Sequence, residues 1–299
     1  MLTAMLKSAG LDANPVLLST KNNGIPIYPT RSGFNYFVAS VKLNNELILL
    51  DASDKYNIPG MLPDYARNWL GRLVREDGTS EWVDLMSKKS SEYKTVLNIQ
   101  IEDNLEINGK ITTFFDGYYA KEFRDKFINL SKEDHIRHLE EEKGDIVISN
   151  LETKNTNILN ESIRESYNFN LNNGIEKIGN NVYMKPLFFL TKESNPFKAN
   201  ERCYPIYFNY PSIVSNTVYV KIPEAYEIES LPESEMITIN DDGAVFKLIV
   251  AASGNYLKID SELKINTVIY LAEDYDTLKN FYNRMIQKNS ETIVLKKTS

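Results

Sequence analysis

The sequence offers few side chains for nucleophilic or imidazole chemistry. Cys203 is the only cysteine, and His135 and His138 are the only histidines. Cys203 lies in a strand-like Arg-Cys-Tyr-Pro run with no histidine nearby in the sequence, and a buried free cysteine usually packs as a small hydrophobe. We therefore expect an unreactive thiol, no internal disulfide and few routes to a mechanism in which histidine is the base.

The two histidines are three residues apart, with Asp134 and Glu142 nearby. On a helix, this spacing could present two imidazoles and a carboxylate to a metal ion. Catalytic zinc sites also need convergent ligands and supporting partners, which the surrounding sequence does not supply. A solvated helix face is the favoured interpretation, and the acidic run at 140–142 is expected to be a solvated helix end. We predict no metal and no cofactor.

Composition sets the class of protein. The chain has 299 residues, with 34 Lys and Arg against 41 Asp and Glu, for a net charge of -7. This is the balance of a globular protein, and the scattered basic residues do not build the positive surface that nucleic acid requires. No window approaches the run of about 20 apolar residues that spans a bilayer. Nucleic-acid binding and a membrane-spanning helix are therefore not expected.

Prolines and glycines indicate the organisation of the chain. Five of the 11 prolines lie at or before Pro63 and the others at or after Pro186, which suggests three parts: 1–84, 85–190 and 191–299. Six glycines directly follow Asn or Asp, a pattern typical of tight turns between strands. They are Gly24, Gly78, Gly109, Gly117, Gly174 and Gly243. The predicted fold class is α+β and mainly β.

In the first part, apolar spacing predicts a helix over 1–9 and strands over 34–43 and 46–51. The helix starts without a capping residue, so we expect its first turns to lie upstream. If Asn44 and Asn45 form a two-residue turn that pairs Leu43 with Glu46, Tyr36 and Asp51 become same-face diagonal neighbours, about 7–8 Å apart.

The second and third parts each predict a β-sandwich-like module with one packed helical segment. In the second part the helical segment is 121–143, which restarts at a capping box formed by Ser131 and Asp134. In the third part the helix is 275–289, with apolar residues at i, i+3, i+4, i+7 and i+8. The 18 tyrosines and 13 phenylalanines could line a sugar or peptide groove, but strands favour aromatic residues for packing alone. Core packing is the favoured interpretation.

Particular segments carry a family resemblance. Residues 6–20, 34–38 and 49–54 look like the second half of a transglutaminase-like cysteine-hydrolase core. The rest resembles the tail that follows this core in secreted bacterial proteins, some of them assigned as peptidases. The tail modules have no assigned activity. Their markers are Asn195-Pro196-Phe197, Arg202-Cys203-Tyr204-Pro205-Ile206, Val220-Lys221-Ile222-Pro223 and the 278–286 helix.

The family uses a cysteine at a helix N-terminus, a histidine on the next strand and an aspartate on the strand after it. In this chain the resemblance places the cysteine upstream of Met1, so it is absent. Tyr36 stands at the histidine position, and a phenol with an ordinary pKa near 10 is a poor base at neutral pH. Only Asp51 matches. We therefore predict Asp51 and Tyr36 to be the remnant of a catalytic triad.

The expected function is a non-catalytic C-terminal portion of a transglutaminase-like hydrolase, whose β modules brace the core or hold a polypeptide or cell-envelope substrate. Two alternatives stay open: a stand-alone β-sandwich module that binds glycan or protein, and a catalytic half completed by an upstream fragment. The resemblance implies a periplasmic or cell-surface location, although the first residues do not have the order of a signal peptide.

Overall fold

We analysed the chain as a computed structural model, which describes residues 1–26, 28, 30 and 32–298. It is mainly β, which confirms the predicted α+β class. The described chain divides into two compact units. The smaller unit comprises Met1–Ser90 with Asn157–Asn160, and the larger unit comprises Ser91–Thr156 with Glu161–Ser299.

The smaller unit is built on a five-stranded sheet in the order β3-β2-β1-β4-β5. The strands are β1 (Ala13–Leu18), β2 (Tyr36–Leu43), β3 (Glu46–Leu50), β4 (Leu70–Val74) and β5 (Ser80–Asp84). The helix α1 (Leu2–Ser8) precedes them, and the short 3-10 helices η1 (Lys21–Asn23) and η2 (Asp64–Ala66) lie in the connections. Val16, Leu18 and Leu62 are among its fully buried core residues.

The turn between β2 and β3 forms as the sequence predicts. Asn44 and Asn45 have φ values of 49° and 66°, which asparagine tolerates better than most residues. Leu43 pairs with Glu46 in the antiparallel ladder. This register fixes which residues of the two strands share a face.

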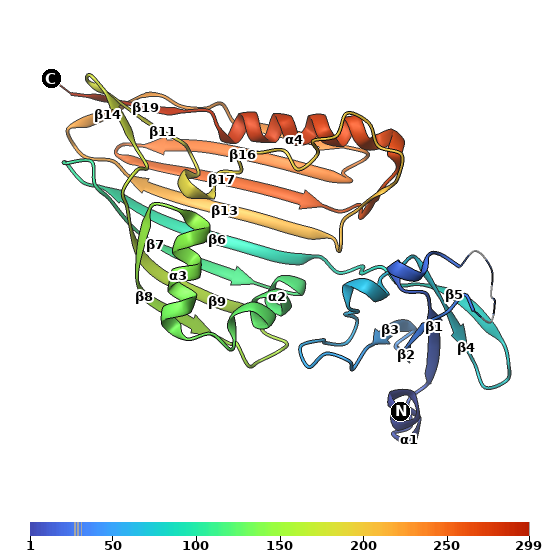
Figure 1. Cartoon of the computed structure of the whole chain (residues 1–299). Coiled ribbons are helices and arrows are strands. Elements are labelled where there is room, and N and C mark those ends of the chain that lie inside the picture. Colours follow the sequence, from blue (N-terminus) through green and yellow to red (C-terminus); the bar gives the residue numbers. More distant parts are fainter. Residues whose placement is uncertain (27, 29, 31, 299) are drawn as a thin grey trace. The chain divides into compact units, whose positions relative to one another are not determined.

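The larger unit is built on an eight-stranded sheet in the order β15-β16-β17-β13-β6-β7-β9-β8 (Figure 1). Strands β6 and β13 run parallel, and the other described pairs are antiparallel. Its strands are β6 (Ser91–Ile101), β7 (Ile107–Phe115), β8 (Ile146–Lys154), β9 (Ile163–Leu171), β13 (Ser212–Lys221), β15 (Glu235–Ile239), β16 (Ala244–Ser253) and β17 (Tyr256–Ile265).

Two smaller sheets complete the larger unit. The first has the order β10-β11-β19-β14, and the second pairs β12 with β18. Their bounds are β10 (Glu176–Ile178), β11 (Asn181–Met184), β19 (Ile293–Lys297), β14 (Tyr226–Ser230), β12 (Ile206–Tyr207) and β18 (Ile269–Tyr270).

Helices cover one face of the large sheet. In Figure 1, α4 (Tyr275–Asn289) runs beside β16, and α3 (Lys132–Lys143) lies beside β8. The remaining helical segments are α2 (Tyr118–Phe127), η3 (Phe188–Leu190) and η4 (Ala272–Asp274). Burial alternates along β6, as expected for a sheet with one packed face and one face in water.

The helical predictions are confirmed. The 121–143 segment is two helices, and the backbone N–H of Asp134 donates to the Ser131 hydroxyl at 3.1 Å, so Ser131 caps α3. The predicted C-terminal helix is α4, and Leu278, Phe281 and Met285 of its apolar stripe are buried.

The two predicted sandwich modules are wrong in one respect. Strands from 85–190 and from 191–299 form one sheet, because β13 pairs with β6 from Ser212 and Ser91 to Lys221 and Gln100. The predicted boundary near residue 84 lies close to the division between the compact units, whereas the one near residue 190 falls inside the larger unit. As a division of the sequence into domains, the three ranges stay a prediction.

The turn prediction is confirmed for Gly243, which lies in the turn between β15 and β16 with its N–H donating to the Asn240 carbonyl at 2.9 Å. Gly24, Gly78 and Gly117 have positive φ. Gly109 instead lies inside β7, where the Phe169 ring covers it so closely that a Cβ would come within 2.4 Å of Phe169 Cζ. This strand needs the glycine for packing rather than for a turn.

Candidate functional site

Asp51 lies at the centre of a small polar cluster in the smaller unit. It directly follows β3, and Tyr36 is the first residue of β2. The Tyr36 hydroxyl donates to Asp51 Oδ2 at 3.0 Å, and the backbone N–H of Ser53 donates to Asp51 Oδ1 at 2.7 Å. Both carboxylate oxygens therefore accept a hydrogen bond from a neighbour in the same sheet region.

A second phenol extends this cluster. Tyr65, from η2, donates its hydroxyl to the Tyr36 oxygen at 3.2 Å, and the two rings meet edge to face with centroids 5.4 Å apart. Tyr65 is 41% exposed, so the chain of hydrogen bonds runs from the surface through Tyr36 to Asp51. We call Tyr36, Asp51, Ser53 and Tyr65 the phenol-carboxylate cluster.

The surroundings keep Tyr36 protonated. Burial raises the pKa of Tyr36 well above its ordinary value near 10. The hydrogen bond with Ser53 opposes this in part, and the Tyr65 hydrogen bond and the Asp51 carboxylate raise the pKa further. Tyr36 therefore acts as a hydrogen-bond donor over the physiological pH range. It cannot take a proton from a nucleophile as a neutral imidazole does.

The structure confirms that Tyr36 and Asp51 are neighbours, as the hairpin register predicted. Their role as the remnant of a triad stays a prediction. Sequence reasoning missed Tyr65, and it also missed Asn57, whose Nδ2 donates to the Asp51 carbonyl at 3.3 Å. Both lie outside the regular strands, in segments with no periodic pattern that could have indicated them.

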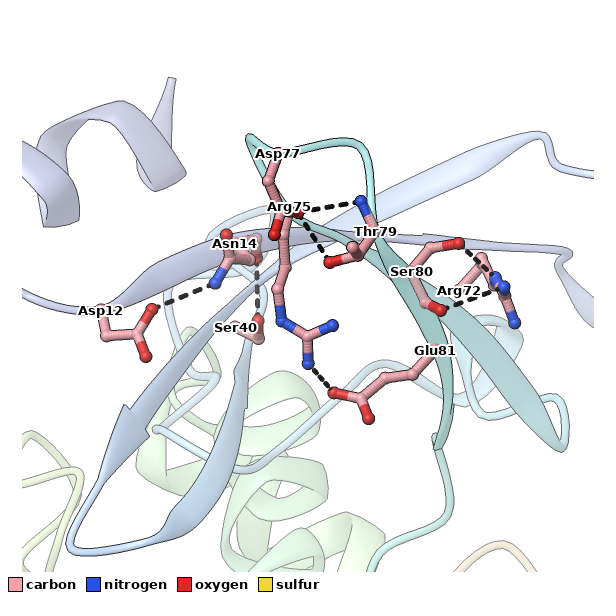
Figure 2. A network of polar contacts seen from close by, with 9 residues as sticks. All are labelled: Asp12, Asn14, Ser40, Arg72, Arg75, Asp77, Thr79, Ser80 and Glu81. Atoms are coloured by element: carbon pink, nitrogen blue, oxygen red, sulfur yellow. Dashed lines mark hydrogen bonds and ion pairs between the residues drawn. The ribbon is translucent and has the colours of Figure 1, made fainter.

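A second polar network in the smaller unit has a structural role (Figure 2). Arg72 on β4 donates to the Ser80 hydroxyl at 2.9 Å and to the Ser80 carbonyl at 3.1 Å, and its guanidinium lies 5.1 Å from the Trp82 ring centroid. In the turn, Asp77 accepts hydrogen bonds from the backbone and hydroxyl of Thr79 at 2.9 and 2.6 Å. These contacts stabilise the β4-β5 hairpin.

The chemistry-bearing residues of the larger unit differ from expectation. Cys203 is exposed, on a bend before β12, rather than buried in a strand. His135 is not on a solvated helix face. It is 6% exposed, and its Nε2 lies 2.8 Å from Glu165 Oε2. On α3, His135 therefore points toward the sheet, where it meets the buried carboxylate of Glu165 on β9.

His138 lies beside Glu142, with 3.8 Å between Nε2 and Oε2. In the part of the chain that the structure describes, no group of three or more His, Cys, Asp or Glu side chains could hold a metal ion. Within the same residues, no helix is long and apolar enough to cross a membrane.

Glu165 ends a row of polar side chains across the helix-covered face of the large sheet. Neighbouring residues of this row are paired from strand to strand: Ser261, Asn216, Thr95, Thr113 and Glu165. All except half-buried Asn216 are buried. Burying polar residues at sheet positions that normally hold apolar ones costs free energy, so this polar row is a candidate binding region.

Several buried tyrosines predict a loss of stability at alkaline pH. Burial, followed by nearby Glu165 and Glu142, raises the pKa of Tyr93 to about 12. Burial and Asp274 raise the pKa of Tyr270 to about 12. Since the unfolded phenol has a pKa near 10, each protonated phenol stabilises the fold fully below pH 10 and loses this contribution between pH 10 and 12.

The expected loss is on the order of 2 kcal/mol for each of the two phenols. It is measured as the free energy of unfolding of the chain as a function of alkaline pH, alongside the phenolate absorbance. A Tyr270→Phe variant should lose less stability over this range than the wild type. A free energy of unfolding that stays constant to pH 12 would contradict the prediction.

Comparisons with known proteins cover different parts of the chain. Residues 180–295 match the family described as "Domain of Unknown Function with solved-structure structure (DUF3858)". This confirms a C-terminal module of unknown function. No curated protein matches the sequence.

A solved structure, described as "a putative protease from Parabacteroides distasonis", is similar to this chain with 10% sequence identity and a TM-score of 0.48. The similarity covers 99% of this chain and 42% of that one. This chain therefore corresponds to less than half of the length of that neighbour.

Proposed function

We propose that this chain is a non-catalytic portion of a transglutaminase-like, peptidase-related protein, and that its larger unit holds a polypeptide or cell-envelope substrate. The observation that carries the proposal is the hydrogen bond from Tyr36 to Asp51. A triad aspartate orients an imidazole, and here that carboxylate receives a phenol that stays protonated. A periplasmic or cell-surface location is part of the same proposal, and it rests on the sequence resemblance.

The distribution of the chemistry-bearing residues supports this proposal. The residues of the smaller unit include no cysteine and no histidine. The two histidines belong to the larger unit, where His135 is committed to Glu165 at 2.8 Å. The unit that contains Asp51 therefore holds neither a thiol nor an imidazole.

The test is an assay of the purified chain for hydrolysis of fluorogenic peptides and for acyl transfer from a glutamine peptide to an amine. We expect no turnover by the wild type. Asp51→Ala should also be inactive, and should destabilise the smaller unit by about 1–2 kcal/mol through two lost hydrogen bonds. Turnover by the wild type that disappears in Asp51→Ala would overturn the proposal. Tyr36→Phe, which should stay folded, is the control for loss of the hydrogen bond alone.

A further inference from the structure

The larger unit contains a pocket of about 300 Å³ at the end of the polar row away from Glu165. Its floor includes Tyr93, Asn216 and Ser261, from three neighbouring strands. Residues from the ends of α3 and α4, and from η3 and the residues on either side of it, also line the pocket. This volume is at the lower end of the range of small-molecule sites. We call it the row pocket.

Asn289, the last residue of α4, is the most informative residue of the row pocket. Its side chain lines the pocket and the residue is 4% exposed, yet its Oδ1 has no hydrogen-bond partner among the described residues. Thr191 also lines the pocket, and its hydroxyl oxygen likewise has no hydrogen-bond partner among the described residues. Buried polar atoms are normally paired, so an amide oxygen and a hydroxyl without partners around one pocket indicate that a ligand supplies their partners.

The groups around the pocket match a peptide group. A side-chain amide offers one acceptor and two donors, and it can pair with the N–H and C=O of a peptide backbone. Asn289 and Asn216 both offer such amides to the pocket. The pocket also has an apolar part formed by Phe246, Leu263 and Met285, which are 1%, 9% and 2% exposed. This part fits one large apolar side chain.

A second pocket, of about 410 Å³, adjoins the first. Lys143 and Phe189 line both pockets, so the two pockets are neighbours on either side of these side chains. An extended polypeptide, with about 3.3 Å per residue, is long enough to reach from one neighbouring pocket to the other. Lys143 lies 3.6 Å from Glu142, so its own charge has a carboxylate partner.

We propose that the row pocket binds an extended polypeptide segment through one large apolar side chain, with the amides of Asn289 and Asn216 pairing with its backbone. This deepens the proposed function and rests on it, because it names the part of the larger unit that holds the polypeptide. Asn289 is a binding residue in this proposal, and its unpaired oxygen is satisfied only when the peptide is present.

The test measures binding of two fluorescein-labelled peptides to the full chain by fluorescence polarisation. The probes are capped Gly-Ala-Leu-Ala-Gly and capped Gly-Ala-Ala-Ala-Gly. We expect the leucine peptide to bind about tenfold more tightly, because the alanine peptide leaves the apolar part unfilled. Asn289→Ala should weaken the leucine peptide by about five- to tenfold.

The matched control is Asn280→Ala, an exposed asparagine on the opposite side of α4, which should leave binding unchanged. Thermal unfolding of each variant provides a second measurement. Asn289→Ala should be at least as stable as the wild type, since it removes a buried polar atom that has no partner. A clear loss of stability would mean that Asn289 serves the fold, and would overturn the assignment.

Two further results would overturn this inference. The first is equal binding of both peptides. The second is unchanged binding of the leucine peptide in Asn289→Ala, which would mean that water, and not a peptide, pairs with the Asn289 oxygen. Neither would affect the absence of turnover, so the proposed lack of catalysis is judged separately. Peptide turnover without binding in the row pocket would instead contradict both proposals.

Discussion

Replacing His135 with leucine should destabilise the larger unit by about 3–5 kcal/mol, because the substitution leaves the Glu165 carboxylate buried without its partner. The two side chains lie 2.8 Å apart, and the residues are 6% and 3% exposed. The imidazole also stacks on Phe127, with ring centroids 4.2 Å apart. The measurement is the free energy of unfolding from chemical denaturation at neutral pH.

Two controls separate the effect of the pair from that of a lost side chain. His138→Leu removes a half-buried histidine from the same helix, beside a carboxylate at 3.8 Å, and should cost less than 1 kcal/mol. The double variant His135→Leu with Glu165→Leu should recover most of the stability, since a buried pair can be replaced by apolar residues at little cost. A stable His135→Leu single variant would contradict the prediction.

Gly109→Val should be the second most damaging change, with a loss of about 2–3 kcal/mol. A Cβ on Gly109 would lie 2.4 Å from Phe169 Cζ and 2.6 Å from the carbonyl oxygen of Asn98. Phe169 is 2% exposed, so its ring cannot swing away without disturbing the core. Circular dichroism during thermal unfolding should show a lower melting temperature.

A compensating change tests the cause of this loss. Phe169→Leu shortens the side chain over Gly109, so the double variant with Gly109→Val should lose less than the sum of the two single losses. Additive losses would assign the cost to the contact with the Asn98 carbonyl instead. A Gly109→Val variant as stable as the wild type would contradict the steric argument altogether.

Local patterns explain which parts of the fold could be predicted. The Asn44-Asn45 turn and the α3 cap depend on residues within a few positions of each other, and both form as predicted. The parallel pairing of β6 with β13 joins strands more than 100 residues apart, and no local pattern encodes it. The inward position of His135 is similar, because its partner Glu165 lies on a distant strand.

The same distinction applies to the candidate sites. Tyr36 and Asp51 belong to one hairpin, so its register alone was enough to predict that they are neighbours. Tyr65 reaches them from a 3-10 helix without periodicity. The row pocket combines residues from four strands, two helix ends and a loop. No local sequence pattern brings these together, so the sequence could not indicate that Asn289 lines a pocket.

The strand pairing across the larger unit has a consequence during protein synthesis. When β6 leaves the ribosome, β7 can cover one of its edges at once, but the other edge waits for β13. In that interval the nascent chain carries an open strand edge of the kind that recruits other chains. Chaperones that shield such edges should therefore increase the yield of folded protein.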